Sequence, residues 1–266
     1  MTFFEVLTAA VNDFIEYGFD SKARLDNWIE QIRRAANSHL KSDSDMNAEM
    51  VKALRAAFTR LVTKGGLINK NVSAFTVEKL KPQLRAELDR RIMASANLIK
   101  YNREQNILNV LRRFEGWATS IPAGGSNAVD RRKQKQDIKV SLGKMGFEQR
   151  RVIIDQTHKL IANINDIVAT DNGAIAAKWH SHWRQANYNY RKDHKERDDK
   201  VYLIRNSWAQ QKGLVKPING YTDDITAPGE EVYCRCNYVY LYNLRSLPEE
   251  MITQKGKEAL ESSKIV

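Results

Sequence analysis

The chain has 266 residues, 42% of them hydrophobic, and its 43 Lys and Arg against 32 Asp and Glu give a formal net charge of +11. This length and apolar content support a folded core and exclude a fully disordered chain, and the basic balance favours polyanionic partners, namely nucleic acid, an acidic protein surface or an anionic membrane. No uncharged apolar run approaches the roughly 18 residues needed to cross a bilayer, and no secretory signal pattern is evident, so we expect no membrane association and synthesis in a cytoplasm.

Residues 1–120 are predicted to form a helical region. Apolar residues recur at helical spacing from Phe3 to Phe14, and Gly18 is expected to end this first helix. Ser21 is expected to cap a second helix, because its hydroxyl can accept a hydrogen bond from the first turn. Further apolar stripes predict a third helix ended by Gly65-Gly66, and more helix beyond it.

Residues 121–150 are predicted to form a hinge and a basic segment. The stretch "SIPAGGSN" (120–127) combines Pro, paired Gly and small polar residues, which is typical of a loop. The next stretch, 130–151, holds eight Lys or Arg against three Asp or Glu. On a helix these cations would contact DNA phosphates without sequence specificity, or an acidic protein partner. The expected contact residues are Arg131, Arg132, Lys133, Lys135, Lys139, Arg150 and Arg151.

Residues 151–245 are predicted to form a compact C-terminal module. Apolar spacing indicates a helix from Phe147 to about Trp183, which Asp171-Asn172-Gly173 could interrupt. "KVYLIR" (200–205) and "VYCRCNYVYLY" (232–242) are typical of strands, and residues 246–266 are predicted to form a polar tail with one short helix. The expected fold class is therefore α+β and mainly α-helical. A long helical N-terminal part precedes a small C-terminal α+β module containing a short antiparallel sheet.

The only two cysteines, Cys234 and Cys236, lie one residue apart in the second predicted strand. In an extended strand they would point the same way, about 7 Å apart, which is at the edge of disulfide reach but suits two soft ligands of one metal. Zinc accepts mixed Cys and His ligands, and His194 is a candidate third ligand. Packing of two small buried side chains and a cysteine nucleophile are the alternatives.

The histidines themselves are not singled out by their sequence context. Trp179 and His180 are expected at a surface or interface, and the charged run around His194 is typical of a solvated face. No phosphate-binding loop, dinucleotide fingerprint, metalloprotease helix or nucleophile elbow occurs in the sequence. We therefore expect a protein that is not an enzyme and that has no cofactor, with zinc as the one candidate.

The C-terminal residues resemble a known family in their order. A segment "RKDH" (191–194) precedes the strand "KVYLIR", a turn-rich stretch and then "YCRCNYVYLY" (233–242). This order resembles the C-terminal domain of the phage Mu F-like head morphogenesis proteins, also called minor capsid proteins. In that family an Arg-x-x-His segment precedes a Cys-Arg-Cys segment, and a variable helical region lies before both. The resemblance covers about residues 178–242.

The resemblance implies a bacteriophage virion protein, present in multiple copies at or inside the head near the portal. Its partners would be the portal protein, other head proteins and packaged phage DNA, and it could leave with the genome during DNA ejection. Arg191 and His194 match the Arg-x-x-His segment, and Cys234, Arg235 and Cys236 match Cys-Arg-Cys. These five residues form the family motif and a possible metal site with His194, Cys234 and Cys236 as ligands. The alternative is a cellular protein that binds nucleic acid without sequence specificity.

Overall fold

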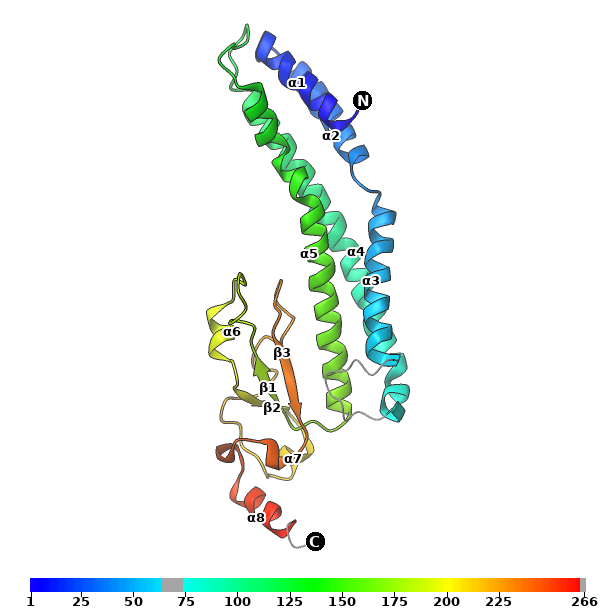
Figure 1. Ribbon diagram of the computed structural model, residues 1–266, viewed down its shortest axis with the longest axis vertical. Helices are drawn as coiled ribbons and strands as arrows, with labels where there is room; N and C mark the ends of the chain where they lie inside the picture. The colour runs from blue at the N-terminus through cyan, green and yellow to red at the C-terminus, as the bar shows by residue number, and fades with distance from the viewer. Residues whose placement is uncertain (64–73, 264–266) are drawn as a thin grey trace. The chain divides into compact units, whose positions relative to one another are not determined.

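The computed structural model describes residues 1–63 and 74–263, and Figure 1 shows its helices and strands. The chain is mainly helical with a small three-stranded antiparallel sheet near its C-terminus, which confirms the predicted fold class. Gly65-Gly66, expected to end the third helix, lie outside the described residues. The long helices are α1 (Phe3–Tyr17), α2 (Lys22–His39), α3 (Asp43–Thr63), α4 (Ala74–Ala118) and α5 (Arg131–Asp171). None of the helices in the described ranges combines the length and apolar character needed to cross a membrane.

Contacts divide the chain into two compact units, and α3, α4 and α5 each contribute to both. The first unit comprises Met1–Val51 and Met93–Val152. The second comprises Lys52–Ile92 and Ile153–Val266. The sheet and all the C-terminal motif residues belong to the second unit.

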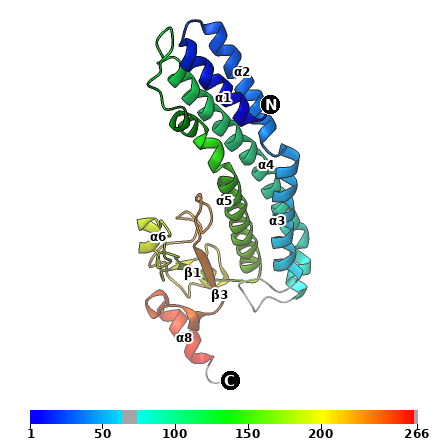
Figure 2. The same cartoon turned by 45° about the horizontal axis from the view of Figure 1, so that its top comes forward.

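The first unit begins with two helices whose ends follow from the sequence. Thr2 and Glu5 form a reciprocal capping box at the start of α1, and Gly18 ends the helix with a left-handed φ of 71°. Ser21 caps α2 by accepting a hydrogen bond from the Arg24 amide, so both predicted helix boundaries are confirmed. Figures 1 and 2 show α1 and α2 side by side. Their apolar faces share one core with α4 and α5, in which Phe14 meets Phe114 edge-to-face at 5.7 Å between ring centroids.

The loop between α4 and α5 is confirmed as a loop, but backbone hydrogen bonds tie it to the end of α1. The amide of Ser126 donates to the Ile15 carbonyl at 2.8 Å, and the amide of Gly124 donates to the Tyr17 carbonyl at 3.0 Å. Gly125 has a φ of 87°, and a Cβ there would lie 2.2 Å from the Ile15 carbonyl oxygen. Hinge motion at this loop would therefore require several hydrogen bonds to break.

The second unit is built on the sheet, in the order β2-β1-β3, with both neighbours antiparallel to the central strand. The strands are β1 (Ala176–His180), β2 (Val201–Leu203) and β3 (Asn237–Leu241). Residues alternate between the two faces of the sheet, as the two-residue period of a strand requires, and each face contributes to a core cluster. Ala176 and Leu203 belong to one core cluster, whereas Ala177, Trp179 and Tyr238 belong to another that also contains both cysteines.

The predicted helix from Phe147 to about Trp183 is wrong in its last third. Helix α5 ends at Asp171, because Gly173 takes a left-handed φ of 80° and the Ala174 amide donates to the Ala169 carbonyl. The chain then enters β1, where Ala176 and Ala177 are fully buried. Burial between two neighbouring strands overrides the helical preference of this alanine-rich stretch.

The segment expected as a polar tail packs on the module. Helical turns η1 (Leu244–Ser246) and η2 (Glu249–Met251) lead into α8 (Gln254–Ser262). Leu247, Met251 and Ile252 are buried in the core cluster that covers one face of the sheet. A Cβ at Gly256 would lie 2.3 Å from the Leu214 carbonyl oxygen, so glycine permits this close approach.

Candidate functional site

The candidate ligands meet at one place in the second unit, on the face of the sheet that carries Trp179. His194 lies on the short helix α6 (Lys192–Glu196), and the two cysteines lie on the segment that leads into β3. The Nδ1 atom of His194 lies 3.5 Å from Cys236 Sγ and 3.7 Å from Cys234 Sγ. His194, Cys234 and Cys236 are 2%, 1% and 3% exposed, so all three are buried. The solvated position that composition favours for His194 is therefore wrong.

The backbone at Tyr233 brings the two thiols to the same imidazole nitrogen. Strand β3 begins only at Asn237, so the predicted strand from Val232 is wrong over its first half. Tyr233 takes a left-handed φ of 60°, which interrupts the extended chain just before Cys234. Its amide donates a 2.6 Å hydrogen bond to the buried carboxylate of Asp155 on α5. That contact holds the turn from which both cysteines project.

Charged side chains surround the other nitrogen of His194. Glu231 Oε2 lies 3.3 Å from His194 Nε2, and the guanidinium Nε of Arg191 lies 2.5 Å from the same carboxylate oxygen. Arg191 also donates to the Val232 carbonyl at 2.9 Å. The Arg-x-x-His spacing thus places the arginine beside the carboxylate that faces the histidine. The order in space is Arg191, Glu231, His194 and then the two thiols.

The pKa values of the two thiols are shifted in opposite directions, down for Cys234 and up for Cys236. A hydrogen bond from the Cys236 thiol lowers the pKa of Cys234 to about 6 against the opposing effect of burial, with help from the Gly229 and Cys236 amides. The same thiol–thiol bond, together with burial, raises the pKa of Cys236 well above its usual range. The pair therefore favours one negative charge, on Cys234, whereas the Cys236 thiol lies within donating distance of the Ser181 hydroxyl oxygen, at 3.8 Å. Thiolates are the form of cysteine that binds metals or attacks electrophiles.

Aromatic rings enclose the cluster. Trp179 is fully buried, so its expected surface position is wrong, whereas His180 is exposed as expected. The indole of Trp179 meets the His194 ring edge-to-face at 5.1 Å and the Tyr238 ring at 5.6 Å. Arg197 covers the indole face with its guanidinium 5.1 Å from the ring centroid. These contacts fix the imidazole in one orientation and keep bulk water away from it.

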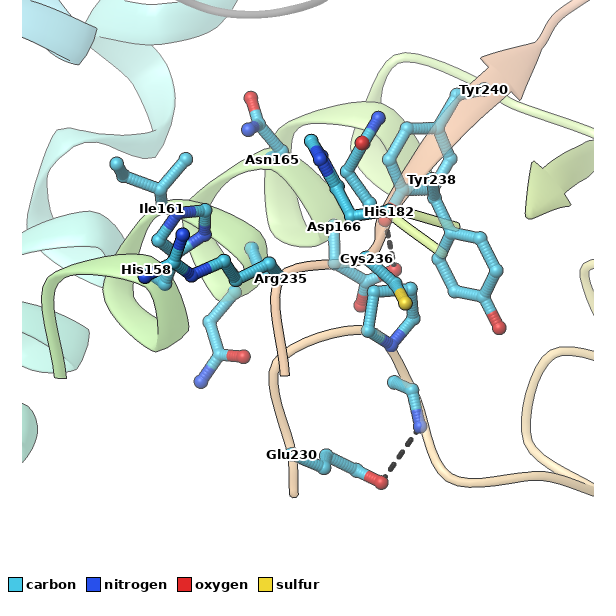
Figure 3. A pocket seen from close by; sticks show the side chains of 15 residues that line it. His158, Ile161, Asn165, Asp166, His182, Glu230, Arg235, Cys236, Tyr238 and Tyr240 are labelled. Carbon is cyan, nitrogen blue, oxygen red and sulfur yellow. Dashed lines mark hydrogen bonds between the residues drawn. The ribbon is translucent and has the colours of Figure 1, made fainter. Parts of the chain in front are cut away.

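Arg235, the middle residue of Cys-Arg-Cys, does not join its neighbours in the cluster. Its guanidinium lies 5.8 Å from the Tyr188 ring, and its backbone amide donates to the Tyr188 hydroxyl at 3.3 Å. Together with His158 and His182 it lines a cavity of about 270 Å³ between α5 and the segment 227–240 (Figure 3). Burial is the largest cause that lowers the pKa of both histidines, which favours their neutral form.

This cavity was not anticipated from the sequence. Asn165, only 3% exposed, lies on its wall, and neither polar atom of its amide has a hydrogen-bond partner among the described residues (Figure 3). The one available signal was an asparagine on the apolar face of the helix, between Ile161 and Val168. Cys236 also lines the cavity, so the thiol cluster adjoins it.

The basic segment forms the first half of α5, in the first unit. Asp130 caps this helix by accepting hydrogen bonds from the Arg132 and Lys133 amides. Arg131, Arg132, Lys133, Arg150 and Arg151 are exposed, whereas Lys135 and Lys139 are half-buried, with the Lys139 ammonium 5.1 Å from the Phe4 ring centroid. Within the described ranges, no carboxylate forms an ion pair with Arg131, Arg132, Lys133, Lys135, Lys139 or Arg150. Elsewhere in this unit, Arg24, Arg34 and Arg103 are each paired with an acid.

Comparison of the sequence with protein-family models finds no match. Comparison with curated proteins and comparison with solved structures find none either. The resemblance to the Mu F-like proteins therefore depends on the motif residues themselves.

Proposed function

We propose that the chain is a minor head protein of the phage Mu F-like type, a structural component of the virion that lies at or inside the head near the portal. The observation that carries the proposal is the meeting of four motif residues. Arg191, His194, Cys234 and Cys236 are spread over 46 positions of the sequence, counted from Arg191 to Cys236, yet form one connected set of contacts. Sequence-distant motif residues that contact one another support the interpretation that the motif belongs to one folded module.

The character of the cluster favours a structural role over catalysis. Its three central side chains are buried, and aromatic rings and ion pairs hold them in place. A nucleophile needs access to its substrate, whereas side chains that fix a module do not. We propose that the cluster fixes the C-terminal module so that it can present a surface to the portal or to other head proteins.

The uncompensated cations of α5 support contact with packaged DNA. A helix rises 1.5 Å per residue, so the stretch 130–151 extends over roughly 30 Å and faces several phosphates of a duplex. Among the described residues, no carboxylate pairs with Arg131, Arg132, Lys133, Lys135, Lys139 or Arg150, so these cations can replace the counterions of DNA. This same observation favours the second candidate, a cellular protein that binds nucleic acid without sequence specificity.

Co-expression with the portal protein of the same genome separates these two candidates. Portal rings purified by affinity should retain the chain at a fixed ratio through size exclusion in high salt, which removes contacts mediated by DNA. A portal protein from an unrelated phage provides the control and should retain none. Retention that disappears with nuclease and salt would contradict the portal-associated role and favour the nucleic-acid-binding protein.

A further inference from the structure

The two thiols and the imidazole have the spacing of ligands around one tetrahedral ion. Bonds of about 2.3 Å to sulfur and about 2.1 Å to nitrogen place neighbouring ligands of tetrahedral zinc about 3.6 Å apart. The two sulfur atoms lie 3.5 and 3.7 Å from His194 Nδ1. All three ligand atoms lie within 4.8 Å of one another. An ion can therefore enter between them with little movement of the side chains.

We propose that His194 Nδ1 and the sulfur atoms of Cys234 and Cys236 bind one zinc ion, which fixes the C-terminal module. No residue of the described ranges adds a fourth His, Cys, Asp or Glu ligand to this group. Ser181 is buried, and its hydroxyl oxygen lies 3.8 Å from Cys236 Sγ. The fourth position is thus left to solvent or to this hydroxyl.

The surroundings of the cluster match those of a metal-bound histidine. Such a histidine commonly directs its second ring nitrogen to a carboxylate, which fixes the tautomer and the ring orientation. Here Glu231 Oε2 lies 3.3 Å from Nε2 with the Arg191 guanidinium beside the same oxygen, although neither Nε2 nor this oxygen has a hydrogen-bond partner among the described residues. A proton on Nε2 leaves Nδ1 with its lone pair directed to the thiols. This explains why an arginine three residues before the histidine belongs to the same site.

The chemistry of the ligands selects zinc over harder cations. Thiolate and imidazole suit Zn²⁺, whereas Mg²⁺ and Ca²⁺ require oxygen ligands. Asp193, His194 and Glu231 also lie close enough to share an ion on the Nε2 side. However, Asp193 is paired with Arg197 at 2.9 Å and Glu231 with Arg191 at 2.5 Å, so both carboxylates already have cationic partners.

The first test is the metal content of the full-length chain, purified in reducing buffer without added metal. Elemental analysis should find about one zinc per chain. After removal by a chelator, titration with Co²⁺ should give the thiolate charge-transfer band and the ligand-field bands of a tetrahedral site, and Zn²⁺ should displace Co²⁺. A chain that binds neither ion while both thiols remain reduced would overturn the proposal.

The second test uses alkylation of the thiols, which reports on this site alone because the chain has two cysteines. Intact mass should show both cysteines protected in the zinc-loaded chain and modified after zinc removal. Equal alkylation with and without zinc would overturn the proposal, and so would a loss of two hydrogens that indicates a Cys234–Cys236 disulfide. Rapid alkylation of Cys234 alone in a chain that binds no metal would also overturn it and point to a nucleophile.

Variants assign the ligands. Cys234→Ser, Cys236→Ser and His194→Gln should each abolish the tetrahedral cobalt spectrum. Glu231→Gln should keep the one-to-one stoichiometry but lower zinc affinity about 10- to 100-fold, as expected for a residue that orients a ligand. The matched control is His180→Gln, an exposed histidine of the same module, which should bind like the parent. If ligand variants bound zinc as tightly as this control, the ion would lie elsewhere and the proposal would be wrong.

This inference does not depend on the virion role. Zinc binding without portal association would support the metal site and refute the proposed function. Portal association without zinc binding would support the proposed function and refute the metal site.

Discussion

Neutralising three cations on one face of α5 should lower the affinity for DNA and the salt dependence of that affinity. Arg131, Lys135 and Lys139 follow one another at four-residue spacing, so they lie on adjacent turns of one helix face. None of the three forms an ion pair within the described part of the chain. The triple variant Arg131→Gln, Lys135→Gln, Lys139→Gln thus removes three charges without leaving an acid unpaired.

The expected magnitude follows from counterion release. Each phosphate contact contributes about 0.9 to the slope of log affinity against log salt. Loss of three contacts should therefore reduce the slope by about 2.7 and the affinity at 0.1 M salt by up to about 500-fold. Fluorescence anisotropy with a labelled random duplex, measured over a range of salt concentrations, gives both quantities.

A matched control separates local contact from total charge. Lys212, Lys216 and Lys255 are exposed residues of the other unit, and their replacement by Gln lowers the net charge of +11 by the same three units. The control variant should change the slope of log affinity against log salt by well under one. Equal weakening in both variants, or an unchanged slope in the α5 variant, would refute the placement of DNA on this helix.

Three further predictions concern the stability of the two units. Gly125→Ala should destabilise the first unit more than Gly124→Ala, because both glycines have φ near 90° but only a Cβ at Gly125 meets backbone, and thermal unfolding of the two variants isolates that clash. Asp155→Ala should cost the second unit about 1–3 kcal/mol in urea unfolding, since it removes the buried acceptor of the Tyr233 amide and the carboxylate that pairs with the half-buried Lys159; an unchanged free energy of unfolding would contradict this. Burial alone would raise the pKa of Asp198, but hydrogen bonds from the Ser181 amide and the Trp183 indole lower it.

The pH dependence of the Asp198 contribution has a definite sign. A carboxyl whose pKa is lower in the folded state stabilises fully above its unfolded value of about 3.9, and the stabilisation is lost as the pH falls through the folded value. Asp198→Asn should therefore flatten the loss of stability on acidification below about pH 4. Urea unfolding at several pH values checks this, and parallel curves for parent and variant would contradict it.

The long helices and their ends could be predicted because their signals are local. Gly18 and Ser21 act on their own turns, and the apolar period of α1 needs no knowledge of distant residues. Strand β2 was predictable from its Val-Tyr-Leu sequence. Strand β1 was not, because Ala176 and Ala177 carry no strand preference and are extended only through pairing on both sides.

The candidate site could be predicted in its residue types but not in its geometry. His194 and Cys234 are 40 residues apart, and nothing in the intervening sequence encodes a distance of 3.7 Å. Tyr233 has no side-chain preference for a left-handed φ, and Asp155, 78 residues away, holds it there. Glu231 was missed because a single glutamate in a turn has no distinguishing signal. Its role follows only from its position between Arg191 and His194.

The most direct measurement of the proposed function is quantitative mass spectrometry of purified phage particles, full and emptied of DNA, with the portal protein as internal standard. A virion protein near the portal should be present at a few copies per portal in full particles. Loss on emptying would identify ejection with the genome, and equal amounts would identify a fixed part of the head. Absence of the chain from both kinds of particle would contradict the virion role.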